Sequence, residues 1–126
     1  MKKILIVIAD YYEDISSTLL KSAKNNLNNF SLKVIKVPGV FEIPVTISKN
    51  IKKYDAFIAL GCVIKGETPH FDFISSASTH AIMNLSVVSK KPIGNGIITC
   101  LNMKQAKARG KKGEEAAQAI ISVLSQ

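Results

Sequence analysis

Continuous apolar runs alternate along the chain with amphipathic stretches, and this pattern predicts strands that alternate with helices. Residues 4–9 and 54–64 are almost wholly apolar, which is typical of strands buried on both faces. Residues 93–100, which follow Lys90-Lys91-Pro92, are expected to form a further strand. Residues 32–37 alternate apolar and basic side chains, as a strand does when its successive side chains point to opposite faces. Four strands are therefore expected.

Between the strands, apolar residues recur at the three- and four-residue spacing of a helix face. The expected stripes are Ile15, Leu19, Ala23 and Leu27; Ile43, Ile47 and Ile51; Ile74, Ala77, Ala81, Leu85 and Val88; and Ala117, Ile120, Ile121 and Leu124. Pro44 fits the second helix only because it falls in the first turn.

The predicted order is strand, helix, four times over, with short connections. Such an order favours a parallel sheet with helices on both faces. We therefore expect an α/β fold, a three-layer flavodoxin-like sandwich with a four-stranded parallel sheet flanked by helices. No linker or repeat divides the sequence, so a single domain is expected over residues 1–126.

Composition narrows the function classes. The chain is 47% hydrophobic and 21% charged, an ordinary globular mixture that excludes disorder. No run approaches the ~20 apolar residues that span a bilayer, and the N-terminal apolar run is shorter than that of a secretory signal. A cytoplasmic protein with no membrane partner is expected. Cys62 and Cys100 lie in apolar runs without metal-site spacing, which favours reduced core residues and no metal.

The formal net charge of +8 attracts anions. The lysines, however, are scattered along the sequence, without a long basic run or the arginine-aromatic pattern of RNA-binding proteins. This favours a solvated surface and no nucleic-acid partner. Arg109 is the one arginine among 17 basic residues, and a planar guanidinium suits a phosphate group.

The candidate catalytic and binding residues lie beyond the carboxyl ends of the predicted strands, which is where ligands bind in parallel α/β sheets. In the sequence GETPH, Thr68 is a natural helix N-cap and Pro69 suits the first helical position. Gly66 allows close approach to an anion at this helix N-terminus. His70 falls in the first turn, where the positive helix end favours a neutral imidazole that can accept a proton. A capping turn with an incidental histidine is an equal alternative, and His80, inside the helix, is expected to be structural or exposed.

Two further loops follow the first and second strands. Phe41 and Glu42 suit a pocket for a small polar ring compound, although a carboxylate is also stabilised at a helix start by the dipole alone. Tyr11 and Tyr12 offer either a stacking surface or core packing.

A basic cluster precedes the last helix. Cations are unfavourable at a helix start. Arg109, Lys111 and Lys112 are therefore neutralised either by Glu114 and Glu115 or by a bound anion such as phosphate.

Three segments together resemble the 6,7-dimethyl-8-ribityllumazine synthase family: VPGVFEIP (residues 37–44), YDAFIALGCVIKGETPHFDFIS (54–75) and KKGEEAA (111–117). The resemblance covers nearly the whole chain. It implies a transferase that condenses 5-amino-6-(D-ribitylamino)uracil with 3,4-dihydroxy-2-butanone 4-phosphate in riboflavin biosynthesis. Phosphate and water leave, and neither a cofactor nor a metal takes part.

The resemblance also implies residue roles. His70 corresponds to the catalytic histidine that moves protons. The substrate-binding positions implied are Tyr11 against the pyrimidine ring; Val40, Phe41 and Glu42 at the ribityl chain; Cys62, Val63 and Ile64 lining the pyrimidine pocket; Glu67, Thr68 and Arg109 at the phosphate; Lys112 near the ribityl end; and Asn95, where many members carry a stacking phenylalanine.

Family members form pentamers with sites shared between adjacent subunits, so a homo-oligomer, at least a pentamer, is implied. Decamers and sixty-subunit shells remain open alternatives. Three other functions are weighed against the synthase: a riboflavin-synthase branch that joins two lumazines, a non-catalytic flavodoxin-like binding module, and a nucleic-acid binder based on net charge.

Overall fold

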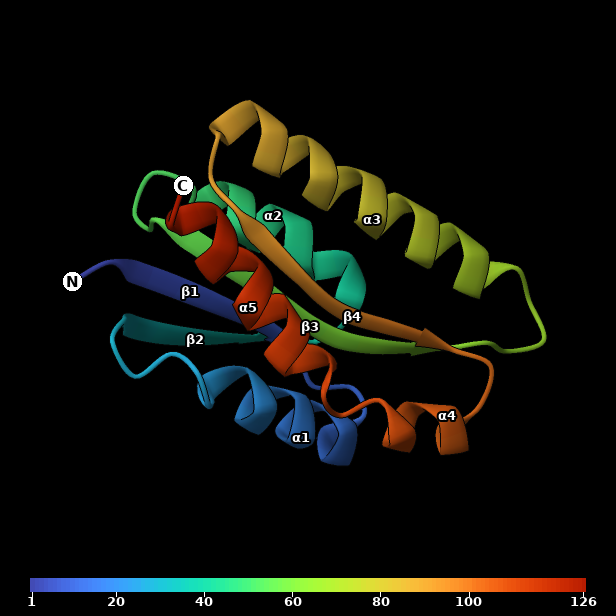
Figure 1. Cartoon of the computed structure of the whole chain (residues 1–126). Helices are drawn as coiled ribbons and strands as arrows, with labels where there is room; N and C mark the ends of the chain where they lie inside the picture. The colour runs from blue at the N-terminus through green and yellow to red at the C-terminus, as the bar shows by residue number, and fades with distance from the viewer.

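A computed structural model describes residues 1–126 and contains one four-stranded sheet (Figure 1). The elements in chain order are β1 (Lys3–Ala9), α1 (Glu13–Lys24), β2 (Ser31–Val37), η1 (Val40–Glu42), α2 (Ile43–Lys49), β3 (Ala56–Ile64), α3 (His70–Ser89), β4 (Ile93–Cys100), α4 (Met103–Ala108) and α5 (Lys112–Leu124). The strands are all parallel in the order β2-β1-β3-β4. The predicted α/β class, with a parallel sheet flanked by helices, is confirmed.

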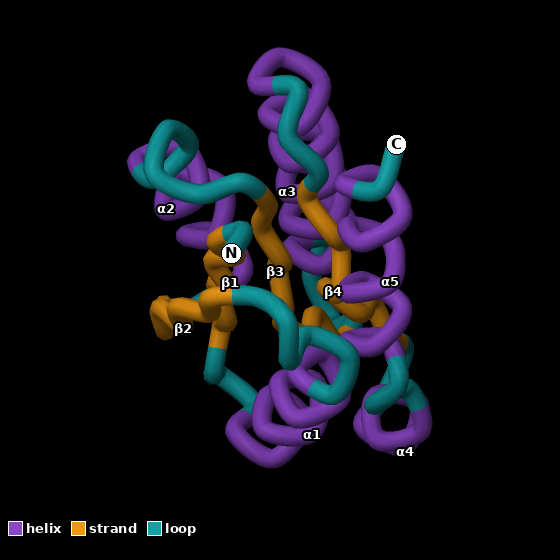
Figure 2. Tube along the Cα trace, turned by 60° about the vertical axis from the view of Figure 1, so that its left-hand side comes forward, coloured by secondary structure: helices purple, strands orange, loops and turns teal.

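Helices cover both faces of the sheet, and the strand period of two decides which core each side chain enters. Ile4, Ile6 and Ile8 of β1 pack with α1 and α5, whereas Leu5 and Val7 pack with α2 and α3. Figures 1 and 2 show α1 and α5 on one side of the sheet and α2 and α3 on the other. None of the helices has the length and apolar character needed to cross a membrane.

The apolar stripe predicted for α3 is right in part: Ile74, Ala81 and Leu85 are half-buried, and Ile74 and Leu85 pack against the core. The buried residues of this helix are Ser78 and Ile82, while Val88 is 73% exposed and Ala77 is also exposed. The Ser78 hydroxyl donates to the Ile74 carbonyl at 2.7 Å, which satisfies its polar group inside the helix. A narrow line of α3 therefore meets the sheet, and much of its apolar surface faces outward.

Two short helices, η1 and α4, were not expected from apolar spacing, because each is too short to show a period. Asn102 caps α4, since its side chain accepts a hydrogen bond from the Gln105 amide at 2.9 Å. The Gln105 side chain in return accepts from the Leu101 amide at 2.8 Å. This reciprocal cap resembles a capping box, and the Asn-x-x-Gln spacing is the signal that could have found α4.

Gly113 lets α5 approach α1 closely, which supplies a stability test. A Cβ at Gly113 would lie 2.1 Å from the Leu19 carbonyl oxygen, whereas nothing lies within 4 Å of a Cβ at Gly66. Because backbone must move to relieve that overlap, Gly113→Ala is expected to lower the free energy of unfolding by about 2 kcal/mol or more. Gly66→Ala should change it by about 0.5 kcal/mol or less. Urea titrations of the two variants measure this, and equal stabilities would contradict the close approach.

Candidate functional site

A cavity of about 600 Å³ opens beyond the carboxyl ends of β1 and β3. Its lining residues are Tyr11, Tyr12, Gly39, Val40, Phe41, Glu42, Cys62, Val63, Ile64, His70 and Ile74. Eight of these were predicted site residues: Tyr11, Val40, Phe41, Glu42, Cys62, Val63, Ile64 and His70. The structure therefore brings four separate segments of the chain to one crevice.

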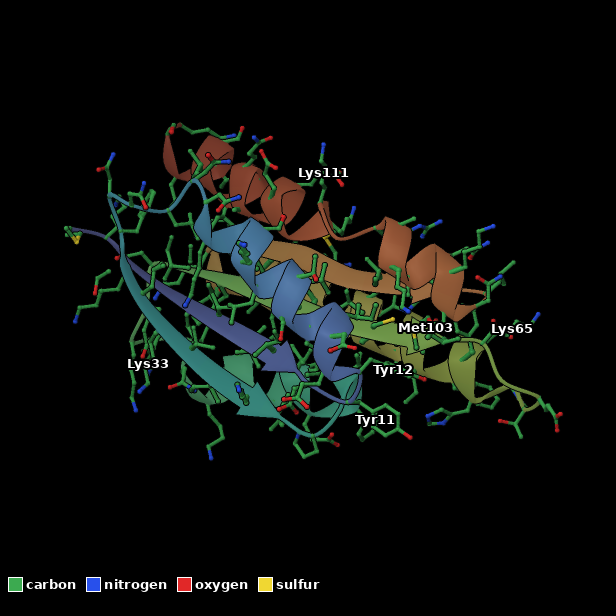
Figure 3. All side chains as sticks on the ribbon, turned by 90° about the horizontal axis from the view of Figure 1, so that it is seen from below. Tyr11, Tyr12, Lys33, Lys65, Met103 and Lys111 are labelled. Carbon is green, nitrogen blue, oxygen red and sulfur yellow. The ribbon has the colours of Figure 1, made fainter.

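Two of these segments supply aromatic side chains to the walls. The loop after β1 carries Tyr11 and Tyr12 (Figure 3), whose rings meet edge to face with centroids 4.9 Å apart. Phe41, in η1, is 67% exposed and Tyr11 is 76% exposed. Two large aromatic faces are thus open to solvent beside a cavity, which suits stacking on a flat ligand.

The loop before α3 differs by one position from the prediction. The N-cap is Pro69 rather than Thr68, so α3 begins at His70. The Thr68 hydroxyl instead accepts a hydrogen bond from the His70 amide at 3.4 Å. Thr68 and Glu67 are exposed and do not line the cavity, whereas His70 does. Figure 3 shows this loop, which also carries Lys65, projecting beyond the sheet.

The floor of the cavity is electrically neutral at ordinary pH. Burial and the neighbouring Cys100 thiol raise the pKa of Cys62 from 9.0 to about 11. Burial, with contributions from Cys62 and Tyr11, also raises the pKa of Tyr12. Both groups therefore keep their protons, and the thiol is a poor nucleophile. Among the lining residues, His70 is the side-chain type best suited to serve as both acid and base.

The raised pKa of Cys62 predicts a pH-dependent stability. The folded protein holds the thiol proton more tightly than the unfolded chain. The part of the free energy of unfolding that this difference supplies is therefore complete below about pH 9, and it is lost as pH rises toward about 11. Across this pH range, the free energy of unfolding of the parent protein should fall by about 2 kcal/mol more than that of the Cys62→Ala variant. Urea unfolding at several pH values measures the difference, and parallel pH profiles for both proteins would contradict it.

A second cavity, of about 470 Å³, lies beside the edge strand β4. Its lining residues are Asn95, Ile97, Ile98, Thr99, Ala108, Arg109, Lys111, Lys112 and Glu115. Arg109 is held there by its guanidinium Nη1, which donates to the Thr99 carbonyl at 3.2 Å. The Asn95 side chain accepts from the Ile97 amide at 3.0 Å.

The two cavities share no lining residue. The predicted residues Asn95, Arg109 and Lys112 are therefore gathered together, but not with His70 in the same chain. Figure 3 likewise shows Lys111 well apart from Tyr11 and Tyr12.

Nine lining residues were not among the predicted site residues: Tyr12, Gly39 and Ile74 in the first cavity, and Ile97, Ile98, Thr99, Ala108, Lys111 and Glu115 in the second. Tyr12 and Lys111 are neighbours of predicted ones, and Ile74 lies one helical turn after His70. That four-residue spacing is the signal that could have found Ile74. Gly39 belongs to the Pro-Gly turn that ends β2, and turn composition alone does not mark it as a lining residue.

Comparison with known proteins places the chain in a family. The family model described as 6,7-dimethyl-8-ribityllumazine synthase matches residues 1–126. The chain belongs to the 6,7-dimethyl-8-ribityllumazine synthase family. Similar relatives include 6,7-dimethyl-8-ribityllumazine synthase 1 of Rhodopseudomonas palustris, 44% identical over 97% of this chain and 83% of the relative. The synthase of Methylorubrum extorquens is 42% identical over 98% and 79%, and that of Bartonella bacilliformis 43% over 97% and 88%.

Proposed function

We propose that this lumazine synthase family member condenses 5-amino-6-(D-ribitylamino)uracil with 3,4-dihydroxy-2-butanone 4-phosphate to form 6,7-dimethyl-8-ribityllumazine. The family match over residues 1–126 supports this transferase reaction of riboflavin biosynthesis. The observation that carries the proposal is the crevice that joins His70 to an aromatic and acidic wall, Phe41 and Glu42. A cavity of about 600 Å³ is of the size that holds small organic ligands.

The pyrimidine substrate occupies the first cavity in this proposal. Tyr11 offers its exposed ring for stacking on the heterocycle. The end of β3, from Cys62 to Ile64, forms the apolar floor. Val40 packs at the rim, and the Glu42 carboxylate accepts hydrogen bonds from ribityl hydroxyls beside Phe41.

The chemistry then needs proton transfer rather than a covalent enzyme intermediate. The substrate amine attacks the ketone carbonyl, and water leaves to give an imine. Phosphate is eliminated, and the resulting enol tautomerises to a ketone. The second nitrogen attacks this ketone, and a second water leaves as the ring closes. His70 accepts a proton from the attacking amine and returns one to the departing oxygen. The protonated Cys62 thiol does not compete with the substrate amine for the electrophilic carbon.

The phosphate half of the site is assembled between two copies of the chain. The exposed Glu67–Thr68 loop stands beside the start of α3, where anions are stabilised. Arg109 and Lys112 supply positive charge, but they line the second cavity and not the first. In this proposal a neighbouring copy presents its β4 cavity, with Asn95, Arg109 and Lys112, to the His70 cavity.

Exposed apolar surface on α2 and α3 supports such an assembly. Val45 is 58% exposed, Phe73 67% and Met83 63%. A further cavity of about 400 Å³ runs between the two helices and is lined by Phe41, Glu42, Pro44, Val45, Ala77, Ser78 and Ala81. Apolar surface of this kind commonly marks a protein contact. We propose a cytoplasmic homo-oligomer, at least a pentamer.

An activity assay tests the proposed reaction. The purified protein is mixed with both substrates, and lumazine formation is followed by absorbance and fluorescence beside a blank without enzyme. We expect a rate well above the blank and competition by inorganic phosphate against the butanone phosphate. A rate equal to the blank would overturn the synthase assignment. A fast reaction that phosphate does not inhibit would overturn only the anion site.

A further inference from the structure

The fold gathers lysines that are scattered in the sequence. Because all four strands are parallel, the segments that enter them meet at one edge of the sheet, the end opposite the His70 cavity. Six exposed lysines lie in these segments, and we call them the amino-edge patch: Lys2, Lys3, Lys49, Lys52, Lys53 and Lys90.

Two hydrogen bonds to backbone carbonyls hold the patch together. The Asp55 amide donates to the Lys3 carbonyl at 2.8 Å, which fixes the turn before β3 beside the start of β1. The Lys91 ammonium donates to the Ile51 carbonyl at 2.6 Å, which ties the turn before β4 to the same place. Neighbouring strands lie about 4.8 Å apart, so these lysines form one surface rather than separate charges.

Almost no negative charge offsets this surface. Of nine acidic residues, only Asp55 lies at this edge, and its carboxylate accepts a hydrogen bond from the Lys3 amide at 2.8 Å. The other eight lie at the opposite end of the sheet, the end at which the His70 cavity opens. They follow the carboxyl ends of strands or lie in the first turns of helices. The net charge of +8 is therefore concentrated at one end, where it creates a strong local field.

Helix-dipole stabilisation explains only part of the cluster. It favours Lys49 and Lys90 near helix C-termini, but Lys2, Lys3, Lys52 and Lys53 lie outside helices. Lys90 also has φ 61° and is the one non-glycine residue with a positive φ. Glycine is the residue that fits this C-cap conformation most readily. A charged lysine therefore occupies a position whose backbone conformation favours glycine.

The shape and chemistry of the patch indicate the class of partner. No patch residue lines any of the four main cavities, so a small anion is not enclosed here. A surface with several exposed lysines fits a polymer with repeated negative charges. The patch itself holds no aromatic side chain, and the nearby Tyr54 ring is half-buried against Phe57. Phosphate contacts without base stacking are therefore favoured.

The lysines that are scattered in the sequence pointed to no nucleic-acid partner, but the fold gathers six of them. Against that expectation, we propose that the amino-edge patch binds the phosphate backbone of double-stranded nucleic acid without sequence preference. Lysines also attract anionic membranes, but basic charge alone attaches a protein weakly unless apolar side chains also insert. The exposed valines near Lys90, Val87 and Val88, lie on α3, the helix assigned above to subunit contact. Since the patch lies opposite the His70 cavity, nucleic-acid binding leaves the substrate site open.

Fluorescence anisotropy with a labelled duplex of about 30 base pairs tests the proposal. At about 100 mM salt we expect a dissociation constant on the order of 10 μM that weakens steeply as salt rises. The double variant Lys52→Gln/Lys53→Gln should bind about tenfold more weakly, with a salt slope smaller by about 2. The matched control is Lys104→Gln/Lys107→Gln on α4, which removes the same charge from exposed positions at the other end of the sheet.

The control variant should bind within about twofold of the parent, and both variants should keep lumazine formation unchanged. An equal loss in both variants would assign the effect to overall charge and overturn the patch. A parent protein that ignores the duplex at low salt, or that binds phosphatidylserine vesicles and not the duplex, would also overturn it. Because activity is measured separately, failure of this proposal is distinguishable from failure of the synthase assignment.

Discussion

Replacing His70 by alanine is expected to lower kcat for lumazine formation by about 100-fold or more. His70 is the first residue of α3 and lines the cavity with Phe41 and Glu42. The reaction requires protons to move at the amine, the departing oxygen and the ring-closing nitrogen, and the Cys62 thiol and Tyr12 phenol both hold their protons tightly. Removing the imidazole leaves water to carry these protons.

His80 provides the matched control for this experiment. It lies ten residues further along the same helix, is exposed, and approaches only the Ser76 hydroxyl, at 3.4 Å. His80→Ala should keep kcat within about twofold of the parent. A His70→Ala variant that remains folded by circular dichroism and keeps full kcat would remove His70 from the mechanism. The remaining rate would then come from holding the two substrates together.

The sequence predicted the sheet well because each strand carries its own signal. β4 runs over Ile93–Cys100, the bounds expected for it, and β3 begins two residues later than expected, at Ala56. The stripe predicted for α3 was right at Ile74 and Leu85 and wrong at Val88, for a physical reason. An apolar face that stays exposed follows the same helical period as one that meets the sheet, so spacing alone does not separate Leu85 from Val88.

The sequence predicted which segments form the candidate site, but it did not predict how all of them are arranged in space. Strand ends converge at one edge in a parallel sheet, and this placed Phe41, Cys62 and His70 in one cavity. The separation of Arg109 from that cavity depends on the edge position of β4. Strand order is a tertiary property that a linear pattern does not contain, and the same holds for the lysines that the fold brings together at the opposite edge.

Co-expressing two impaired variants is expected to restore part of the activity if the site is shared between subunits. Arg109→Ala should raise the KM for the butanone phosphate by about 10- to 100-fold, because a charge-assisted hydrogen bond to the phosphate is lost. His70→Ala damages the other half of the proposed site. In mixed oligomers formed by co-expression, a copy carrying Arg109→Ala still presents an intact His70, and its neighbour carrying His70→Ala presents an intact Arg109.

Random mixing of equal amounts places a native half against a native half in about a quarter of the sites. Assayed below the KM of the parent, the co-expressed mixture should therefore recover about a quarter of the parental rate, far above either variant alone. The matched control co-expresses the parent with the double variant His70→Ala/Arg109→Ala, which also leaves about a quarter of sites intact when subunits mix, but about half when they do not. A mixture no more active than the average of its two single variants would contradict a site formed by His70 of one copy and Arg109 of the next. A residue other than Arg109 would then have to bind the anion beside the Thr68 loop.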